Sequence, residues 1–214
     1  MKQTHIFLFK HFIVIIYIIF FGQCKNYDAK VEQEVNYIDK SELGRVIPNI
    51  GISCDKEVMT VVLQRILKND QIMRSGGGFD IQKDEAHQDT VVNIIEKCGM
   101  PDSAKVGKKG LLAIYLVLQH SNKYMLQYYF PMIKEICHKG ELPIRLAATT
   151  EDRLLVDNNK PQIYGTQVYS KGSEYLLRPL QDTCKVDSLR KVVGMKPIRE
   201  YLEEWEIKYD FKCQ

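Results

Sequence analysis

Apolar residues recur at helical spacing through most of the chain after residue 53. A first helix is predicted to begin at Ser53 as its N-cap and to end before the glycine-rich segment 75–78. A second helix is predicted from about Asp84 to Cys98, where Gly99 stops it. The residues that form the two apolar faces are Val58, Val61, Val62, Ile66, Leu67, Val91, Ile94, Ile95 and Cys98.

The segment 111–118 is apolar on every side. A helix without a polar face is normally surrounded by other helices, so we expect this one at the centre of the domain, ending at Gln119 and His120. Two further helices are predicted over residues 123–138 and 143–156, the second with proline in its first turn.

Further along the chain the pattern becomes β-prone. Residues 162–169 and 174–178 flank a turn at 171–172, which predicts a small hairpin, and short helices are expected over 187–193 and 197–209. A two-stranded hairpin is not stable alone, so it must pack on the helices. The sequence therefore predicts a mainly α domain, a compact bundle of about six to seven helices around a central apolar helix with one small β-hairpin.

The first 24 residues differ from the rest of the chain. They hold two lysines, no acidic residue and an unbroken apolar run over residues 12–21. As a helix that run rises only about 15 Å, half of a hydrocarbon core, which is typical of a signal peptide; a retained membrane anchor is the alternative. Cys24 follows the run and resembles the lipidated first residue of a bacterial lipoprotein, although Gln23 stands where a small residue is usual. Ordinary signal-peptidase cleavage is the alternative there.

These features predict the domain organisation and the compartment. We expect a signal peptide over residues 1–23, a lipidated N-terminus and tether over 24–50, and a single helical domain over 51–214. The expected location is the cell envelope, either lipid-anchored at the membrane or periplasmic or secreted. In such a compartment some of five further cysteines can pair, with at least one left over: Cys54, Cys98, Cys137, Cys184 and Cys213.

Composition narrows the classes of function. Hydrophobic residues make up 45% and charged residues 27%, which fits a globular protein and not a disordered one. The net charge is +3, and without the leader it is +1, from 28 basic and 27 acidic residues, so nucleic-acid binding is not expected. The sequence contains no P-loop, no nucleophile elbow and no paired metal-ligand spacing, so neither a cofactor nor a metal is expected.

Polar positions on two helices could carry chemistry. His120 could act as a general base or bind a ligand, and a terminal histidine favoured by the helix dipole is the structural alternative. Asp152 and Arg153 point about 100° apart on their helix, so one could line a site while the other supports the fold. A structural ion pair is the alternative. Asp70 and Arg74 stand four residues apart and suit a local salt bridge.

The segment 162–167 is dense in polar groups. It offers two amides, a phenol and a hydroxyl around Gly165, whose missing side chain allows close backbone approach or a positive φ. Such a segment could grip a polar ligand through several donors and acceptors. A hairpin strand with outward polar residues is the alternative.

The polar motifs of the chain, taken in their sequence order, resemble those of a bacterial domain family of unknown function over roughly residues 58–201. The family has no established activity, but its polar signature implies either a buried polar network or a site. Met100 stands where the family often has Trp or Tyr, which puts an aromatic wall there in doubt. The motifs that carry the resemblance are Asp70-Gln71-x-x-Arg74, Asp89, Asn93, Gly99-x-Pro101, Gly107, Gln119-His120, Asp152-Arg153, Gln162-x-Tyr164-Gly165-Thr166-Gln167, Arg190 and Gly194.

Three hypotheses follow for the function. In the first, a cell-envelope domain binds a small polar or anionic ligand in a polar pocket. In the second, the same cluster is a hydrolase-type enzyme in which His120 is a general base activated by Asp152. In the third, the polar network is structural and the protein acts through its surface. The expected ligand-binding residues are Asp70, Gln71, Arg74, Gln119, Arg153, Gln162, Tyr164, Thr166 and Gln167.

Overall fold

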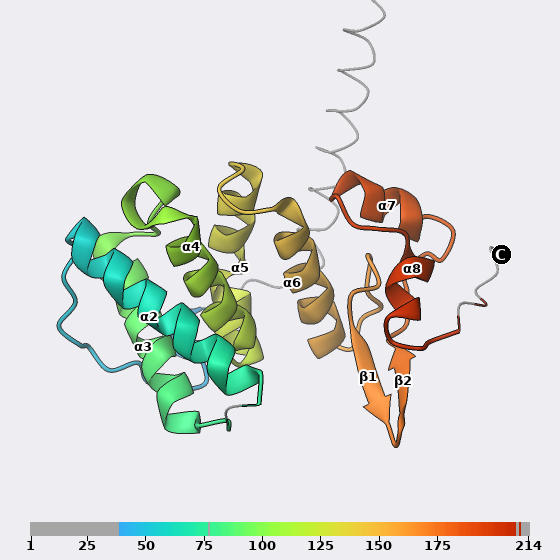
Figure 1. Ribbon diagram of the computed structural model, residues 1–214, viewed down its shortest axis with the longest axis horizontal. Helices are drawn as coiled ribbons and strands as arrows, with labels where there is room; N and C mark the ends of the chain where they lie inside the picture. The colour runs from blue at the N-terminus through green and yellow to red at the C-terminus, as the bar shows by residue number, and fades with distance from the viewer. Residues whose placement is uncertain (1–38, 77, 209, 211–214) are drawn as a thin grey trace, which may run out of the picture. The chain divides into compact units, whose positions relative to one another are not determined.

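The computed structural model describes residues 39–76, 78–208 and 210 (Figure 1). Within these residues the chain forms seven α-helices and one two-stranded antiparallel hairpin, which confirms the predicted mainly α class. The predicted leader and Cys24 lie outside the described residues. The elements are η1 (Lys40–Glu42), α2 (Lys56–Arg74), α3 (Ile81–Cys98), α4 (Ser103–His120), α5 (Lys123–His138), α6 (Ile144–Asp157), β1 (Val168–Lys171), β2 (Glu174–Leu177), α7 (Val186–Val192) and α8 (Ile198–Glu203).

The apolar helix is central, as its pattern predicts. α4 packs against α2, α3 and α5, and its residues Leu111, Ile114 and Leu118 are completely buried. The hydroxyl of Tyr115 donates to the carbonyl of Leu146 on α6, 3.4 Å away. No helix in the described part of the chain combines the length and the apolar character that crossing a membrane requires.

α4 is longer than its apolar run because a glycine interrupts it. The helix begins at Ser103 after Asp102, whose side chain accepts the N–H of Lys105. Gly107 then takes a φ of 69°, in the left-handed region, and breaks the helix into two parts. Only the second part shows an apolar pattern on all sides, and the sequence predicts only that part.

Helix starts follow the capping side chains, and two predicted starts are wrong for this reason. The N-cap of α2 is Asp55, not Ser53, and its carboxylate accepts the N–H groups of Glu57 and Val58. α3 starts at Ile81 because Asp80 caps it, three residues before the predicted start.

Residues 39–54 lie along α3 and do not form a tether as far as residue 50. Arg45 forms an ion pair with Asp89 at 2.6 Å. The amide of Asn93 donates to the carbonyl of Pro48 at 2.9 Å. This part of the expected tether therefore belongs to the folded domain.

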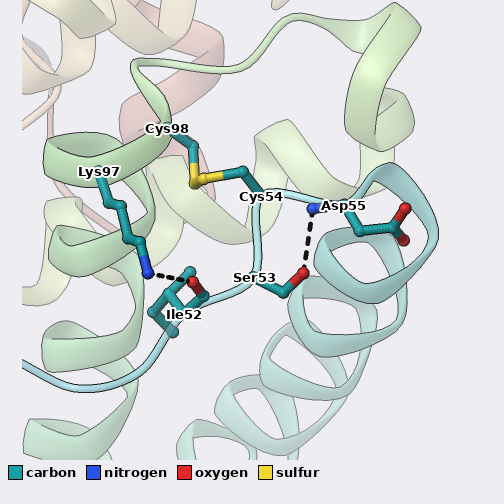
Figure 2. The surroundings of a disulfide bond; sticks show 6 residues. All are labelled: Ile52, Ser53, Cys54, Asp55, Lys97 and Cys98. Carbon is teal, nitrogen blue, oxygen red and sulfur yellow. Dashed lines mark hydrogen bonds between the residues drawn. A yellow bond between two sulfur atoms is a disulfide. The ribbon is translucent and has the colours of Figure 1, made fainter.

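A disulfide bond joins the end of that segment to the end of α3. Cys54 and Cys98 are bonded, with their Cα atoms 5.5 Å apart (Figure 2). Beside the bond, Lys97 Nζ donates to the carbonyl of Ile52 at 2.7 Å. A disulfide restricts the conformations of the unfolded chain and so stabilises the folded one. For a bond across 44 residues this effect is about 4 kcal/mol. The expectation that some cysteines pair is thus confirmed for this pair.

The hairpin is shorter than predicted and packs with the last helices. Val168 pairs with Leu177 and Lys171 with Glu174, so the first strand starts at residue 168, not at 162. A small apolar cluster of Val186, Ile198 and Leu202 forms the core of this part, with Leu177 of β2 packed against it. The residues before the strand, 162–167, are instead folded against α6.

Candidate functional site

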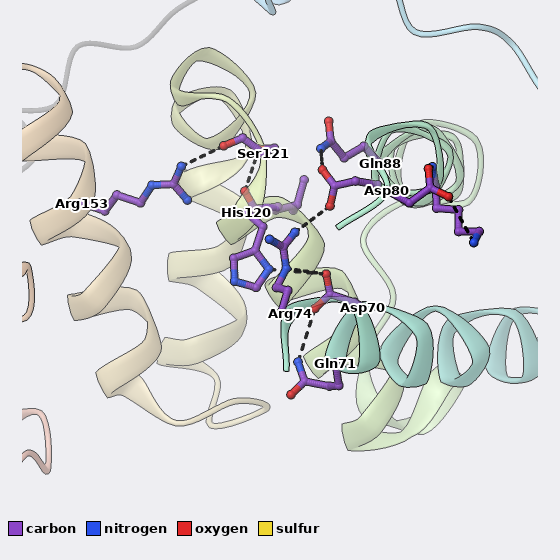
Figure 3. A network of polar contacts seen from close by, with 11 residues as sticks. Asp70, Gln71, Arg74, Asp80, Gln88, His120, Ser121 and Arg153 are labelled. Carbon is purple, nitrogen blue, oxygen red and sulfur yellow. Dashed lines mark hydrogen bonds and ion pairs between the residues drawn. The ribbon is translucent and has the colours of Figure 1, made fainter. Parts of the chain in front are cut away.

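Two buried acids and one arginine meet where α2 ends and α3 begins (Figure 3). Arg74 Nε donates to Asp70 Oδ1 at 2.8 Å, and Arg74 Nη2 donates to Asp84 Oδ1 at 2.6 Å. The local salt bridge predicted between Asp70 and Arg74 is confirmed, and Asp84 is an additional partner. Buried charges are stable only when they are paired in this way.

Two amides fix the remaining carboxylate oxygens. Gln88 Nε2 donates to Asp84 Oδ2 at 2.7 Å, one turn along α3. Gln71 Nε2 lies 3.4 Å from Asp70 Oδ2 and donates to it. Each acid is therefore held by the guanidinium on one oxygen and by an amide on the other.

His120, the last residue of α4, faces this pair of acids. Its Nδ1 lies 3.6 Å from Asp70 Oδ1. That nitrogen is buried and makes no hydrogen bond with a described residue. Nε2 makes no hydrogen bond with a described residue either, but unlike Nδ1 it is not a buried atom without a partner, so it is the ring nitrogen with access to solvent.

The electrostatic surroundings keep His120 neutral. Burial lowers the pKa of the imidazole below its ordinary value of 6.5, and the positive charge of Arg74 lowers it further. Asp70 opposes these two effects by raising the pKa, and Arg153 lowers it again. The neutral form of the imidazole is therefore favoured at pH 7. His87 on α3 has a pKa lowered by burial as well, with Asp70 and Asp84 opposing.

Arg153 approaches the same place from α6. Its Nη2 donates to the carbonyl of Ser121, the residue after His120, at 2.9 Å (Figure 3). Its Nε lies 3.6 Å from Asp157 Oδ2 in a partly exposed ion pair. We name the whole group the α4-end cluster: Asp70, Arg74, Asp84, His120 and Arg153.

Asp152 points away from this cluster, which corrects the expected pairing with His120. Its Oδ1 accepts the N–H groups of Ile163 and Tyr164 at 2.7 and 2.9 Å. Its Oδ2 accepts the N–H and the hydroxyl of Thr166 at 2.9 and 2.8 Å. Adjacent helix residues differ by about 100°, so when Arg153 faces α4, Asp152 faces the 162–167 segment. The carboxylate beside His120 is that of Asp70.

The expected ligand-binding residues of segment 162–167 surround Asp152. Gln162 is fully buried, and its Nε2 donates to the carbonyls of Gln167 and Arg178 at 3.0 and 2.9 Å. Gln167 returns a bond from its N–H to Gln162 Oε1 at 2.7 Å. Tyr164 is buried, and its carbonyl accepts from Arg190 at 2.7 Å. These groups bond with one another and with the backbone, and we name them the Asp152 cluster: Asp152, Gln162, Tyr164, Thr166, Gln167 and Arg190.

Gln119 belongs to neither cluster. Its Oε1 accepts the hydroxyl of Thr150 at 2.7 Å, which links α4 to α6. Among the expected site residues, the structure thus brings together Asp70, Gln71, Arg74, His120 and Arg153, and it places the others elsewhere.

Sequence reasoning missed Asp84, a member of the α4-end cluster, and Gln88, which donates a hydrogen bond to Asp84. Their signal was present, because a carboxylate and an amide four residues apart lie on the same face of a helix. Asp84 was interpreted only as the start of that helix. Over the described ranges, no set of three or more His, Cys, Asp or Glu side chains is arranged to hold a metal ion.

The fold and the clusters define an α-helical domain with polar groups collected at the end of its central helix. Residues 67–214 match a family of unknown function, DUF6624, and the chain belongs to this family. No curated protein and no solved structure matches the chain. The matched residues include both polar clusters, whereas Cys54 and the segment along α3 precede them.

Proposed function

We propose that this domain binds a small polar or anionic ligand at the α4-end cluster. The observation that carries the proposal is partial exposure. The side chains of Arg74, His120 and Arg153 are 27%, 28% and 25% exposed, and the first two lie beside Asp70, whose side chain is nearly inaccessible. Each of the three side chains is therefore accessible from solvent.

The two polar clusters differ in whether their hydrogen-bonding groups all have partners. In the Asp152 cluster, both carboxylate oxygens are satisfied by a total of four donors and no part of Asp152 is exposed. In the α4-end cluster, Arg74 uses Nε and Nη2, and Arg153 uses Nη2 in its hydrogen bond. Within the described residues, Nη1 of each arginine has no hydrogen-bond partner, and neither has Nε2 of His120. These groups are therefore available to a ligand.

Charge favours Arg153 as the contact for an anion. The charge of Arg74 is offset by Asp70 and Asp84, both at hydrogen-bonding distance. Among the described residues, the acid paired with Arg153 is Asp157, at 3.6 Å and partly exposed. A guanidinium offers a planar fork of donors that fits a carboxylate or a phosphate. The proposed ligand therefore has such a group directed at Arg153.

A thermal-shift screen of small carboxylates and phosphates tests this proposal. A ligand present at 100 times its dissociation constant should stabilise the folded chain by about 2.7 kcal/mol and raise its melting temperature. His120→Gln and Arg153→Gln should each weaken binding of that ligand at least about tenfold, with little change in melting without ligand. Arg145→Gln is the matched control, because Arg145 is an exposed arginine on the same helix, and it should bind as wild type.

Two results would contradict the ligand site. One is a screen in which no compound shifts the melting temperature of the wild-type chain. The other is a large loss of melting temperature in His120→Gln, because the cluster would then be a structural network.

We also propose that the domain works in the cell envelope, attached through Cys24. The disulfide between Cys54 and Cys98 supports this location, because such bonds persist mainly in oxidising compartments. The leader sequence and the position of Cys24 after it support the lipid anchor.

Cys24→Ser is expected to move the protein from the membrane fraction to the soluble fraction, since the residue that would carry the lipid is lost. Immunoblots of fractionated cells measure the change. Cys184→Ser is the control, because Cys184 is an exposed free thiol far along the chain, and this variant should stay with the membranes. Retention of the Cys24 variant in the membrane fraction would exclude the anchor.

A further inference from the structure

The two nitrogens of the His120 ring have different surroundings. Nδ1 is buried and faces Asp70 Oδ1 at 3.6 Å, whereas the exposed side of the ring carries Nε2. In a neutral imidazole one nitrogen carries the hydrogen and the other has a lone pair. The partner of one nitrogen decides which form is present.

Asp70 is arranged to accept a hydrogen from Nδ1. Its carboxylate is nearly inaccessible and lies between three groups that carry hydrogens: Arg74, Gln71 and His120. An ionised carboxylate only accepts hydrogen bonds, so an imidazole beside it is favoured with its hydrogen on Nδ1. Catalytic hydrogen bonds are often long before a ligand binds, and 3.6 Å is short enough to close by a small ring movement.

Arg74 keeps Asp70 available for this role. Its Nε holds Asp70 Oδ1 at 2.8 Å, and its Nη2 is fixed by Asp84 at 2.6 Å. The guanidinium therefore holds the carboxylate in place through a charge-assisted hydrogen bond. Asp84 supports Arg74 but is not the acid that faces the imidazole.

We infer that Asp70 and His120 form a carboxylate–imidazole dyad that presents the lone pair of His120 Nε2 to the ligand as a proton acceptor. This inference rests on the proposed ligand site and adds the chemistry of the ligand. The ligand has a hydroxyl group, or holds a water molecule, against Nε2.

The dyad can transfer one proton in a balanced step. The O–H bond of the hydroxyl or water breaks, its electron pair stays on the oxygen, and the proton forms a bond to Nε2. The resulting imidazolium is stabilised by the carboxylate of Asp70. Asp70 is a positioning residue in this scheme, and His120 is the proton acceptor.

The position of the ring hydrogen can be measured without knowing the ligand. Long-range proton–nitrogen correlation spectra of the nitrogen-15-labelled full-length chain, at about pH 8, distinguish a protonated from an unprotonated ring nitrogen. His120 is assigned by comparison with His120→Gln. In the wild-type chain we expect a small ring movement to close the 3.6 Å gap to Asp70, which gives the form with hydrogen on Nδ1 in about tenfold excess or more, as for a hydrogen bond to a charged acceptor.

Two variants test whether Asp70 itself places the ring hydrogen of His120 or whether any acid of the cluster has this effect. Asp70→Ala should remove the excess and shift His120 towards the form with hydrogen on Nε2, which imidazole side chains favour in water. Asp84→Ala also removes one acid partner of Arg74, but it leaves the acid beside Nδ1 and should keep the wild-type form. If Asp70→Ala does not fold, the wild-type spectrum alone decides.

The dyad would be overturned by a wild-type spectrum with hydrogen on Nε2, or by an unchanged spectrum in folded Asp70→Ala. Neither result concerns ligand binding, which the thermal-shift screen measures separately. A chain with the expected spectrum but without a ligand would contradict the proposed function, and a chain that binds ligand with the opposite spectrum would contradict only the dyad.

Discussion

Asp152→Ala is expected to lower the free energy of unfolding by about 3–5 kcal/mol, because it removes the acceptor of several buried hydrogen bonds at once. The carboxylate accepts three backbone N–H groups and the hydroxyl of Thr166, and it is completely inaccessible to solvent. Alanine leaves four donors without their acceptor, those of Ile163 and Tyr164 in fully buried positions and those of Thr166 in partly buried ones, and each lost partner carries a desolvation cost. Urea denaturation followed by circular dichroism measures the loss.

Asp157→Ala provides the comparison for this variant. Asp157 lies on the same helix, is partly exposed, and contacts Arg153 only at 3.6 Å. Such exposed pairs contribute at most about 1 kcal/mol, so this variant should be nearly as stable as wild type. Equal losses in the two variants would show that the bonds of Asp152 do not hold segment 162–167.

Gly165→Ala is expected to destabilise the chain by about 2–4 kcal/mol, from backbone strain and steric overlap together. Gly165 has a φ of +70°, in the left-handed region. A Cβ there would lie 2.4 Å from Ile198 Cδ1 and 3.2 Å from Leu180 Cδ2. The sequence-based expectation of a positive φ or a close approach is confirmed, and both occur. The same urea denaturation measures the change.

Gly172→Ala isolates the backbone part of this effect. Gly172 has a φ of +65° in the hairpin turn, but a Cβ there meets nothing within 4 Å. Its loss should be only about 1–2 kcal/mol, from the left-handed backbone. Combining Gly165→Ala with Ile198→Val, which removes the Cδ1 atom, should cost less than the sum of the two single changes. An additive double variant would exclude the overlap with Ile198.

The sequence predicts the helices best where capping and apolar pattern agree. The helix over residues 123–138 has the predicted bounds because Asn122 caps its start and Gly140 follows its end. The bend at Gly107 was not predicted, since a glycine inside a polar stretch shows no local sign of its φ. The hairpin was predicted, but its first strand starts six residues late because segment 162–167 bonds to Asp152 on another helix.

The sequence predicted which residues lie at the candidate site better than it predicted which of them pair with one another. Arg74, His120 and Arg153 were expected at one site and lie in one cluster. The predicted pairing of His120 with Asp152 was wrong. Which residue of α6 faces His120 depends on which face of α6 points to α4. A dense polar segment such as 162–167 looks the same in sequence whether it binds a ligand or satisfies a buried carboxylate. Only tertiary contacts distinguish these two cases.

The bond between Cys54 and Cys98 has a topological consequence for the site. It closes residues 54–98 into a covalent ring, and this ring contains three members of the α4-end cluster, Asp70, Arg74 and Asp84. If a protease cut the backbone between α2 and α3, Asp70 and Asp84 would lie on separate fragments. The disulfide between Cys54 and Cys98 would still join these fragments. All five members of the α4-end cluster would therefore remain in one covalent molecule after such a cut.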